Sequence, residues 1–232
     1  MPVKIDYVLE DANVFKKATD NHTDVISISG DGQKKQAALA AGISNLTSLN
    51  TAQIMAENFV GQKTAEQNTL MQNADDLLTE IQNAAKSASK DKSNNISLKV
   101  FKIGTDKPDT VKGMTSWLDY FSDVVVQYHD ILAANGMTGD DIAGVHTLYV
   151  SLVASNAAQE NAKKLRNAAT ARRDNAATAL QQTVAGMRSY VKNVFKGDPS
   201  TLEEFKPIPK GRGKGGAAPN PPAPQPPAAP SK

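Results

Sequence analysis

The sequence predicts an all-α protein: an elongated helical bundle of two pseudo-repeats, each a short helix followed by a long helix, with the two long helices antiparallel. Three observations carry this prediction. The chain resembles itself at an offset of about 106 residues. Two stretches, 33–90 and 139–196, contain no proline and only isolated glycines. The hydrophobic residues, 40% of the chain, are rich in alanine, and only 5% of the chain is aromatic, which favours close helix contacts over a bulky core.

The internal repeat rests on sparse identities between the two halves of the chain. At the offset of 106 residues the identical pairs are Phe15 and Phe121, Gly30 and Gly136, Asn50 and Asn156, Gln53 and Gln159, Ala56 and Ala162, and Thr64 and Thr170. A second anchor, at an offset of 104 residues, matches Leu98-x-x-Phe101-Lys102 with Leu202-x-x-Phe205-Lys206. We therefore predict a first helical repeat at 1–106, a second at 107–206, and a basic tail rich in Pro, Ala and Gly, without regular structure, at 207–232.

Each repeat begins with short amphipathic segments. Residues 1–10 alternate apolar and polar side chains, which predicts a short strand or an extended arm, and residues 11–28 have a weak helical pattern. The counterpart in the second copy, at about 115–134, has a broad apolar face and predicts one helix. The aromatic residues expected to anchor the core are Phe15, Trp117, Phe121, Phe101 and Phe205.

A glycine turn precedes each long helix, at Gly30 in the first copy and at Gly136 in the second. Polar residues follow both glycines and are suited to cap a helix. A continuous helix over either proline-free stretch would be about 87 Å long and needs a partner along its length. An interruption near Gly61 would instead turn the first long helix into a hairpin, and the sequence leaves both alternatives open.

The heptad seam of each long helix is apolar at both ends and polar in the middle. There the seam falls on Asn50 and Asn156, while an adjacent row with Ala56, Phe59 and Leu165 takes over, as in a stutter. Two paired asparagines would set the register of the helices, because an unpaired amide in an apolar seam is penalised in every other alignment. The alternative is that both asparagines lie on a solvated flank.

Four motifs of the second copy lie at 116–121 (SWLDYF), 135–142 (NGMTGDDI), 171–174 (ARRD) and 194–198 (VFKGD). Together they resemble a broad group of bacterial all-helical proteins with a Trp-containing short helix, a Gly-Leu-Thr-like turn, a long Ala-rich helix with an arginine, and a basic, often Pro-rich end. Met137 stands where leucine is usual, and the first copy has Asp11 in place of the tryptophan. The group has no established activity, so the resemblance implies the fold only.

A second resemblance involves residues 77–83 (LLTEIQN), which are similar to coiled-coil stretches of bacterial filament subunits such as flagellins. It implies a filament or surface subunit as one alternative. The chain has no cysteine and starts without the basic and apolar regions of a secretory signal, which favours a cytoplasmic protein. Surface or extracellular placement by non-classical export stays open. No apolar run approaches the length of a membrane span.

No residue pattern points to an enzyme, a metal site or a cofactor. The three histidines, His22, His129 and His146, do not form the His-x-x-x-His or His-Glu-x-x-His motifs of helical zinc sites. The sequence also lacks phosphate-binding glycine motifs and a serine nucleophile elbow. We therefore expect no catalysis, no cofactor and no small-molecule substrate. An enzyme or metal carrier would rest on scattered His and Asp residues alone.

The positive charge of the chain is concentrated at its end, because five basic residues and no acidic one follow Glu204. Residues that would contact nucleic acid or a partner there are Lys206, Lys210, Arg212 and Lys214. So few charges would bind nucleic acid weakly and without sequence preference; the alternative is a solubilising spacer. The sequence thus predicts a non-enzymatic structural or scaffolding homo-oligomer that self-associates through long helices, with a nucleic-acid-associated protein as the alternative.

Overall fold

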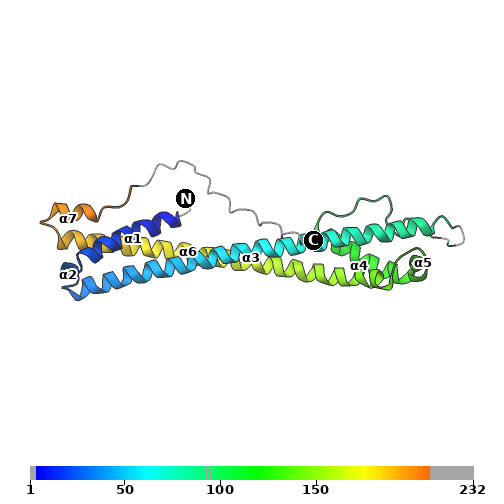
Figure 1. Ribbon diagram of the computed structural model, residues 1–232, viewed down its shortest axis with the longest axis horizontal. Helices are drawn as coiled ribbons and strands as arrows, with labels where there is room; N and C mark the ends of the chain where they lie inside the picture. The colour runs from blue at the N-terminus through cyan, green and yellow to red at the C-terminus, as the bar shows by residue number, and fades with distance from the viewer. Residues whose placement is uncertain (1–3, 92–93, 95, 210–232) are drawn as a thin grey trace, which may run out of the picture. The chain divides into compact units, whose positions relative to one another are not determined.

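All regular elements in the described part of the chain are helices, and two of them are long. The computed structural model describes residues 4–91, 94 and 96–209 (Figure 1). Its helices are α1 (Ile5–Asn21), α2 (Thr23–Ile26), α3 (Gly30–Ala88), α4 (Val111–Gln127), α5 (His129–Ala134), α6 (Gly139–Val194) and α7 (Pro199–Glu204). The prediction of an all-α protein with long helices is confirmed.

Helix α1 begins at Ile5, so the prediction of a strand or an extended arm is wrong from this residue onward. The buried residues Ile5, Val8, Ala12 and Phe15 follow one another at intervals of three or four. This interval places them on one face of a helix. The apolar alternation that suggested a strand is shorter than this helical pattern, which continues beyond residue 10.

Both short segments are divided into a longer and a shorter helix. His22, with φ −117° and ψ 28°, separates α1 from α2. Tyr128, with φ −106° and ψ 17°, separates α4 from α5. Because neither residue has helical dihedrals, the single helix predicted over 115–134 is wrong in its continuity. The weak helical pattern over 11–28 covers the end of α1 and all of α2.

Helices α3 and α6 run for 59 and 56 residues respectively. Helix α3 passes through Gly61 without interruption, so the hairpin alternative is wrong. A Cβ built on Gly61 would meet nothing within 4 Å. An isolated glycine of this kind lowers helix propensity without breaking a helix that is packed elsewhere.

Contacts divide the chain into two compact units, which are described separately. Unit 1 comprises Met1–Ile43 and Leu180–Lys232, of which the structure describes residues 4–43 and 180–209; unit 2 comprises Ser44–Ala179. Helices α3 and α6 each contribute a segment to both units. The predicted sequence repeats stay a prediction, because this division concerns contacts in space.

Unit 1 has an aromatic core between α1, the first part of α3, the last part of α6 and the segment around α7 (Figure 1). The rings of Phe15 and Phe205 meet edge to face with centroids 5.6 Å apart, and Phe195 stacks on Phe205 at 5.8 Å. At Gly32, α3 passes so close to α2 that a Cβ would lie 1.8 Å from the carbonyl oxygen of Ile26. Only glycine fits this approach.

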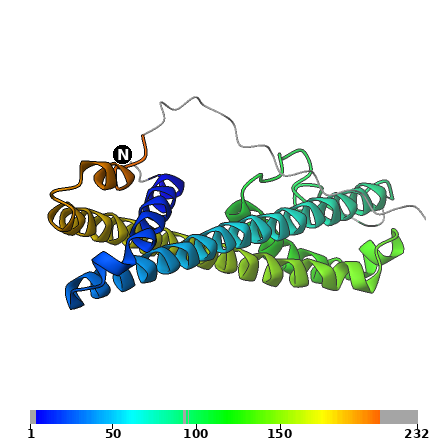
Figure 2. The ribbon, with the colours of Figure 1, turned by 60° about the vertical axis from the view of Figure 1, so that its left-hand side comes forward.

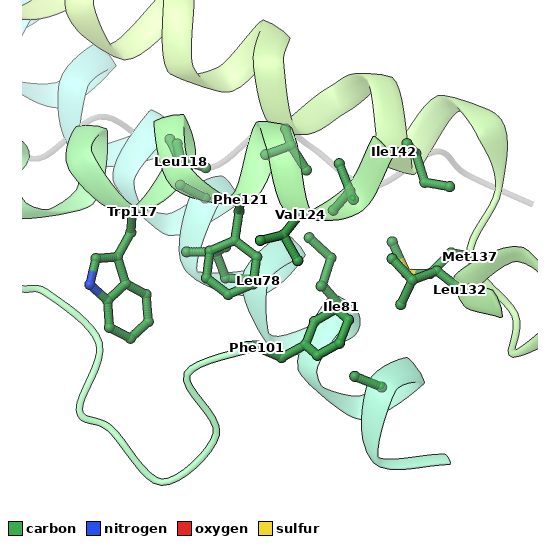
Figure 3. Close-up of a cluster of buried hydrophobic side chains, with 14 of the residues drawn as sticks. Leu78, Ile81, Phe101, Trp117, Leu118, Phe121, Val124, Leu132, Met137 and Ile142 are labelled. Atoms are coloured by element: carbon green, nitrogen blue, oxygen red, sulfur yellow. The ribbon is translucent and has the colours of Figure 1, made fainter. Parts of the chain in front are cut away.

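Unit 2 has the larger described apolar cluster, formed by α4 with the second part of α3 and the first part of α6 (Figure 3). Phe121 of α4 and Leu78 of α3 are fully buried. The loop between α3 and α4 inserts Phe101, whose carbonyl oxygen accepts a hydrogen bond from Gln82 Nε2 at 3.1 Å. This bond ties the loop to α3 beside the point where the phenyl ring is buried.

Candidate interaction site

The five predicted aromatic anchors are all buried, in two groups. Phe15 and Phe205 meet in unit 1, whereas Phe101, Trp117 and Phe121 belong to the cluster of unit 2. Phe15 comes from the short helix of the first predicted repeat and Phe205 from the closing motif of the second. Unit 2 combines the same two parts from the opposite repeats: Phe121 comes from the short helix of the second repeat, and Phe101 comes from the closing motif of the first.

Three buried glutamines form the polar seam between α3 and α6 in unit 2. They are Gln53, Gln67 and Gln159, each less than a tenth exposed. Gln53 Oε1 accepts a hydrogen bond from Arg173 at 3.1 Å, and Gln159 Nε2 donates to Thr64 Oγ1 at 3.1 Å. The seam is therefore polar and hydrogen-bonded, which avoids the free-energy cost of burying unpaired amides.

The two asparagines predicted to set register do not lie opposite each other. Asn156 is exposed and accepts a hydrogen bond from Gln67 Nε2 at 3.4 Å. Asn50 is half-buried. Gln53 and Gln159 are an identical pair of the repeat, and this match was the sequence signal that could have identified the glutamine seam. A register-setting role for Asn50 and Asn156 stays a prediction.

One side of this helix pair carries apolar residues that have solvent access. Phe59 of α3 is 39% exposed and Leu165 of α6 is 53% exposed. The neighbouring alanines Ala56 and Ala169 are half-buried, and Ala162 is fully buried. We name Ala56, Phe59, Ala162, Leu165 and Ala169 the alanine-rich face. It consists of the adjacent row that the sequence showed where the heptad seam becomes polar.

In unit 1, Arg188 of α6 connects three segments of the chain. Its guanidinium donates to Asp11 Oδ1 of α1 at 2.7 Å and to the carbonyl oxygen of Phe205 at 3.3 Å, and it lies 5.0 Å from the centre of the Phe15 ring. Asp11 also accepts a hydrogen bond from the backbone N–H of Ile208 at 3.2 Å. The C-terminal segment is thus fastened to α1 and α6 as far as Ile208.

A mostly apolar cavity of about 370 Å³ lies beside this segment. Its lining residues are Arg188, Lys192, Leu202, Phe205, Lys206 and Pro207. Of the four predicted basic contacts, Lys206 is exposed and pairs with Glu203. Lys210, Arg212 and Lys214 lie outside the described residues. The cavity is a gap at the edge of the aromatic core, beside Phe205.

The histidines are separated from one another. His22 contacts Glu204 at 3.2 Å, His129 contacts Asp130 at 3.0 Å, and His146 lies beside the ring of Tyr149. Within residues 4–91, 94 and 96–209, no three His, Cys, Asp or Glu side chains are grouped so that they would hold a metal ion.

None of the described helices combines the length and the apolar composition that crossing a membrane requires. Comparisons with protein-family models, with curated proteins and with solved structures find no match for this chain.

Proposed function

We propose that this chain is a non-enzymatic structural or scaffolding protein that self-associates through its long helices. The observation that carries the proposal is the alanine-rich face, where the large apolar side chains of Phe59 and Leu165 are accessible to solvent among small alanines. Exposed apolar patches of this kind are typical of surfaces that bind another protein. Helices of 56 and 59 residues also exceed the usual length in a single globular core.

We propose further that the bundle consists of two related copies whose long helices pack antiparallel. Contacts in unit 2 support this arrangement, because positions later in α3 meet positions earlier in α6: Gln53 bonds Arg173, and Gln67 bonds Asn156. The reciprocal exchange of Phe15 with Phe205 and of Phe121 with Phe101 supports the duplication, since each copy would complete the core of the other.

Sedimentation velocity over a wide range of protein concentration tests the proposed function. We expect a concentration-dependent oligomer, because apolar surface leaves water when copies associate. Negative-stain electron microscopy of the same sample would separate a closed oligomer from a filament. A monodisperse monomer at every concentration would contradict the proposal.

The alternative function is weak nucleic-acid binding through the basic tail, and the run of basic residues without an acid after Glu204 favours it. The structure shows where to truncate the chain: after Pro209, because Ile208 still bonds Asp11. Removing Lys210, Arg212, Lys214 and Lys232 should reduce the slope of log affinity against log salt by about 3 to 4 for DNA. Equal DNA retention by the truncated and full-length chains would exclude this function.

A further inference from the structure

The alanine-rich face lies on a part of unit 2 where α3 and α6 are accompanied by no other helix of that unit. The apolar cluster around α4 includes α3 only from Leu70 onward and α6 only up to Leu152. In the stretch before Leu70, α3 runs beside the stretch of α6 after Leu152 (Figure 2). Two helices alone leave one side of each apolar row uncovered.

Phe59 and Leu165 lie at the same level of this pair. Gln53 is opposite Arg173, and Thr64 is opposite Gln159. Both helices rise by about 1.5 Å per residue, and Phe59 lies about midway between Gln53 and Thr64. Phe59 is therefore opposite the midpoint between Arg173 and Gln159, which is close to Leu165. The same comparison brings Ala56 close to Ala169.

Phe59 and Leu165 also lie on the same side of the pair. Phe59 follows the buried Gln53 by six residues, and Leu165 follows the buried Gln159 by six. At about 100° per residue, both are rotated by the same angle away from the seam. Equal rotations on helices that run in opposite directions lead to the same side. Ile54, one residue after Gln53, points to the opposite side and is 49% exposed.

We propose that the alanine-rich face binds a second copy of this chain, with α3 of one copy lying over α6 of the other. This inference rests on the proposed self-association and specifies its surface. Alanines allow two helix axes to approach to about 8 Å, and Phe59 and Leu165 supply the large side chains that fill the centre. Pairing two identical faces produces a closed four-helix arrangement around a two-fold axis.

Charge determines which helix lies over which. In the stretch 46–69, α3 carries Glu57 and Glu66 against a single Lys63. In the stretch 155–178, α6 carries five basic residues and two acidic ones. Placing α6 over α6 would bring like charges together, whereas placing α3 over α6 brings opposite charges together.

The two-helix stretch that carries the alanine-rich face, 46–69 with 155–178, has enough surface for a stable dimer. A stretch of about 24 residues is about 36 Å long, and two helices side by side are about 20 Å wide. Contact over this area would bury about 700 Å² per copy, or about 1,400 Å² in total, which is within the range of specific stable interfaces.

Sedimentation equilibrium of three aspartate variants tests the surface. We expect Phe59→Asp and Leu165→Asp each to raise the dimer dissociation constant at least about 100-fold, because each would bury an unpaired charge in the interface. Ile54→Asp, an equally exposed apolar site on the opposite side, should change it less than about threefold. Circular dichroism of each variant verifies that the helix content is retained.

The possible outcomes separate the face from the function. A monomeric wild type overturns both the self-association and this surface, and leaves the face for a different partner. An oligomeric wild type that is equally sensitive to Ile54→Asp, or insensitive to Phe59→Asp and Leu165→Asp, overturns the surface and retains self-association.

Disulfide cross-linking tests the arrangement of the two copies, because the chain has no cysteine of its own. A mixture of Phe59→Cys and Leu165→Cys chains, one carrying a size tag, should form the mixed disulfide in preference to either self-disulfide. Preferential cross-linking of Phe59→Cys to itself would show α3 over α3 and overturn the proposed arrangement.

Discussion

Single residues connect segments that are far apart in the sequence, and Arg188 shows this in unit 1. Its ion pair with Asp11 has a separation of 2.7 Å, and the two side chains are only 20% and 13% exposed. Removing one partner of an ion pair with so little solvent access lowers the free energy of unfolding more than removing one partner of a surface pair, because the remaining charge is left without compensation.

The first prediction concerns this ion pair. Arg188→Leu should lower the free energy of unfolding by about 3 kcal/mol, since Asp11 would remain buried and unpaired. Urea denaturation measures this change, with the exposed Arg172→Leu as the matched control. Adding Asp11→Leu to Arg188→Leu should restore part of the loss. A double variant less stable than Arg188→Leu would argue against the unpaired charge as the cause.

The second prediction concerns Asp198, the N-cap of α7. Hydrogen bonds from the side chains of Thr201 and Ser200 stabilise its charged form and lower the pKa of its carboxyl group to about 2. Because the folded pKa lies below the unfolded value of 3.8, the stabilisation is complete above the unfolded value and is lost as pH falls towards 2. An NMR titration of the Asp198 carboxyl carbon measures the pKa directly, and a value near 4 would contradict the cap.

At the scale of elements, glycines provide a matched pair of substitutions on α3. Gly61 is open to solvent, whereas Gly32 abuts the Ile26 carbonyl. The third prediction is that Gly61→Ala raises the free energy of unfolding by about 1 kcal/mol through helix propensity. Gly32→Ala should lower it by about 2 to 3 kcal/mol through overpacking. Thermal denaturation distinguishes the signs, and a loss for Gly61→Ala would be inconsistent with a continuous helix there.

The long helices were predictable because their limits are marked by local chemistry. The proline-free stretches place the ends of α3 and α6 within three residues of those observed. The glycine turn predicted at Gly136 has the expected positive φ. The turn predicted at Gly30 is wrong, because this residue is the first of α3. The breaks at His22 and Tyr128 were not predictable in this way. Neither position carries a glycine or proline, and the residues around both breaks differ only modestly in helix propensity, so no strong local signal marks either break.

The candidate site was partly visible in the sequence. The repeat and the heptad shift named Ala56, Phe59 and Leu165 as an adjacent row, but their exposure depends on the extent of α4. That extent is a tertiary property. The hydrogen bonds of the glutamine seam were not predictable, because asparagine and glutamine fit the same heptad positions. Which of the two side chains is long enough to bond from α3 to α6 depends on the separation of the two helices, which the sequence does not give.

At the scale of the whole molecule, stability and association should depend on different aromatic residues. The fourth prediction is that Phe121→Ala lowers the free energy of unfolding by about 3 to 5 kcal/mol, because Phe121 is fully buried and its loss leaves a cavity. Phe59→Ala should leave the stability of the monomer nearly unchanged and weaken the dimer. Urea denaturation at a protein concentration below the dissociation constant of the dimer measures the stability of the monomer alone and so separates the two effects. Equal destabilisation by both variants would contradict this separation.

Trp117 is the only tryptophan of the chain, and it lies at the edge of the unit 2 cluster (Figure 3). The ammonium group of Lys102, held by the loop between α3 and α4, lies 4.8 Å from its ring. Intrinsic fluorescence therefore reports on unit 2 and on its loop, while far-ultraviolet dichroism reports on helices in both units. If the fluorescence and dichroism transitions coincide during denaturation, the two halves of each long helix unfold cooperatively. If the transitions are separate, the two halves unfold independently.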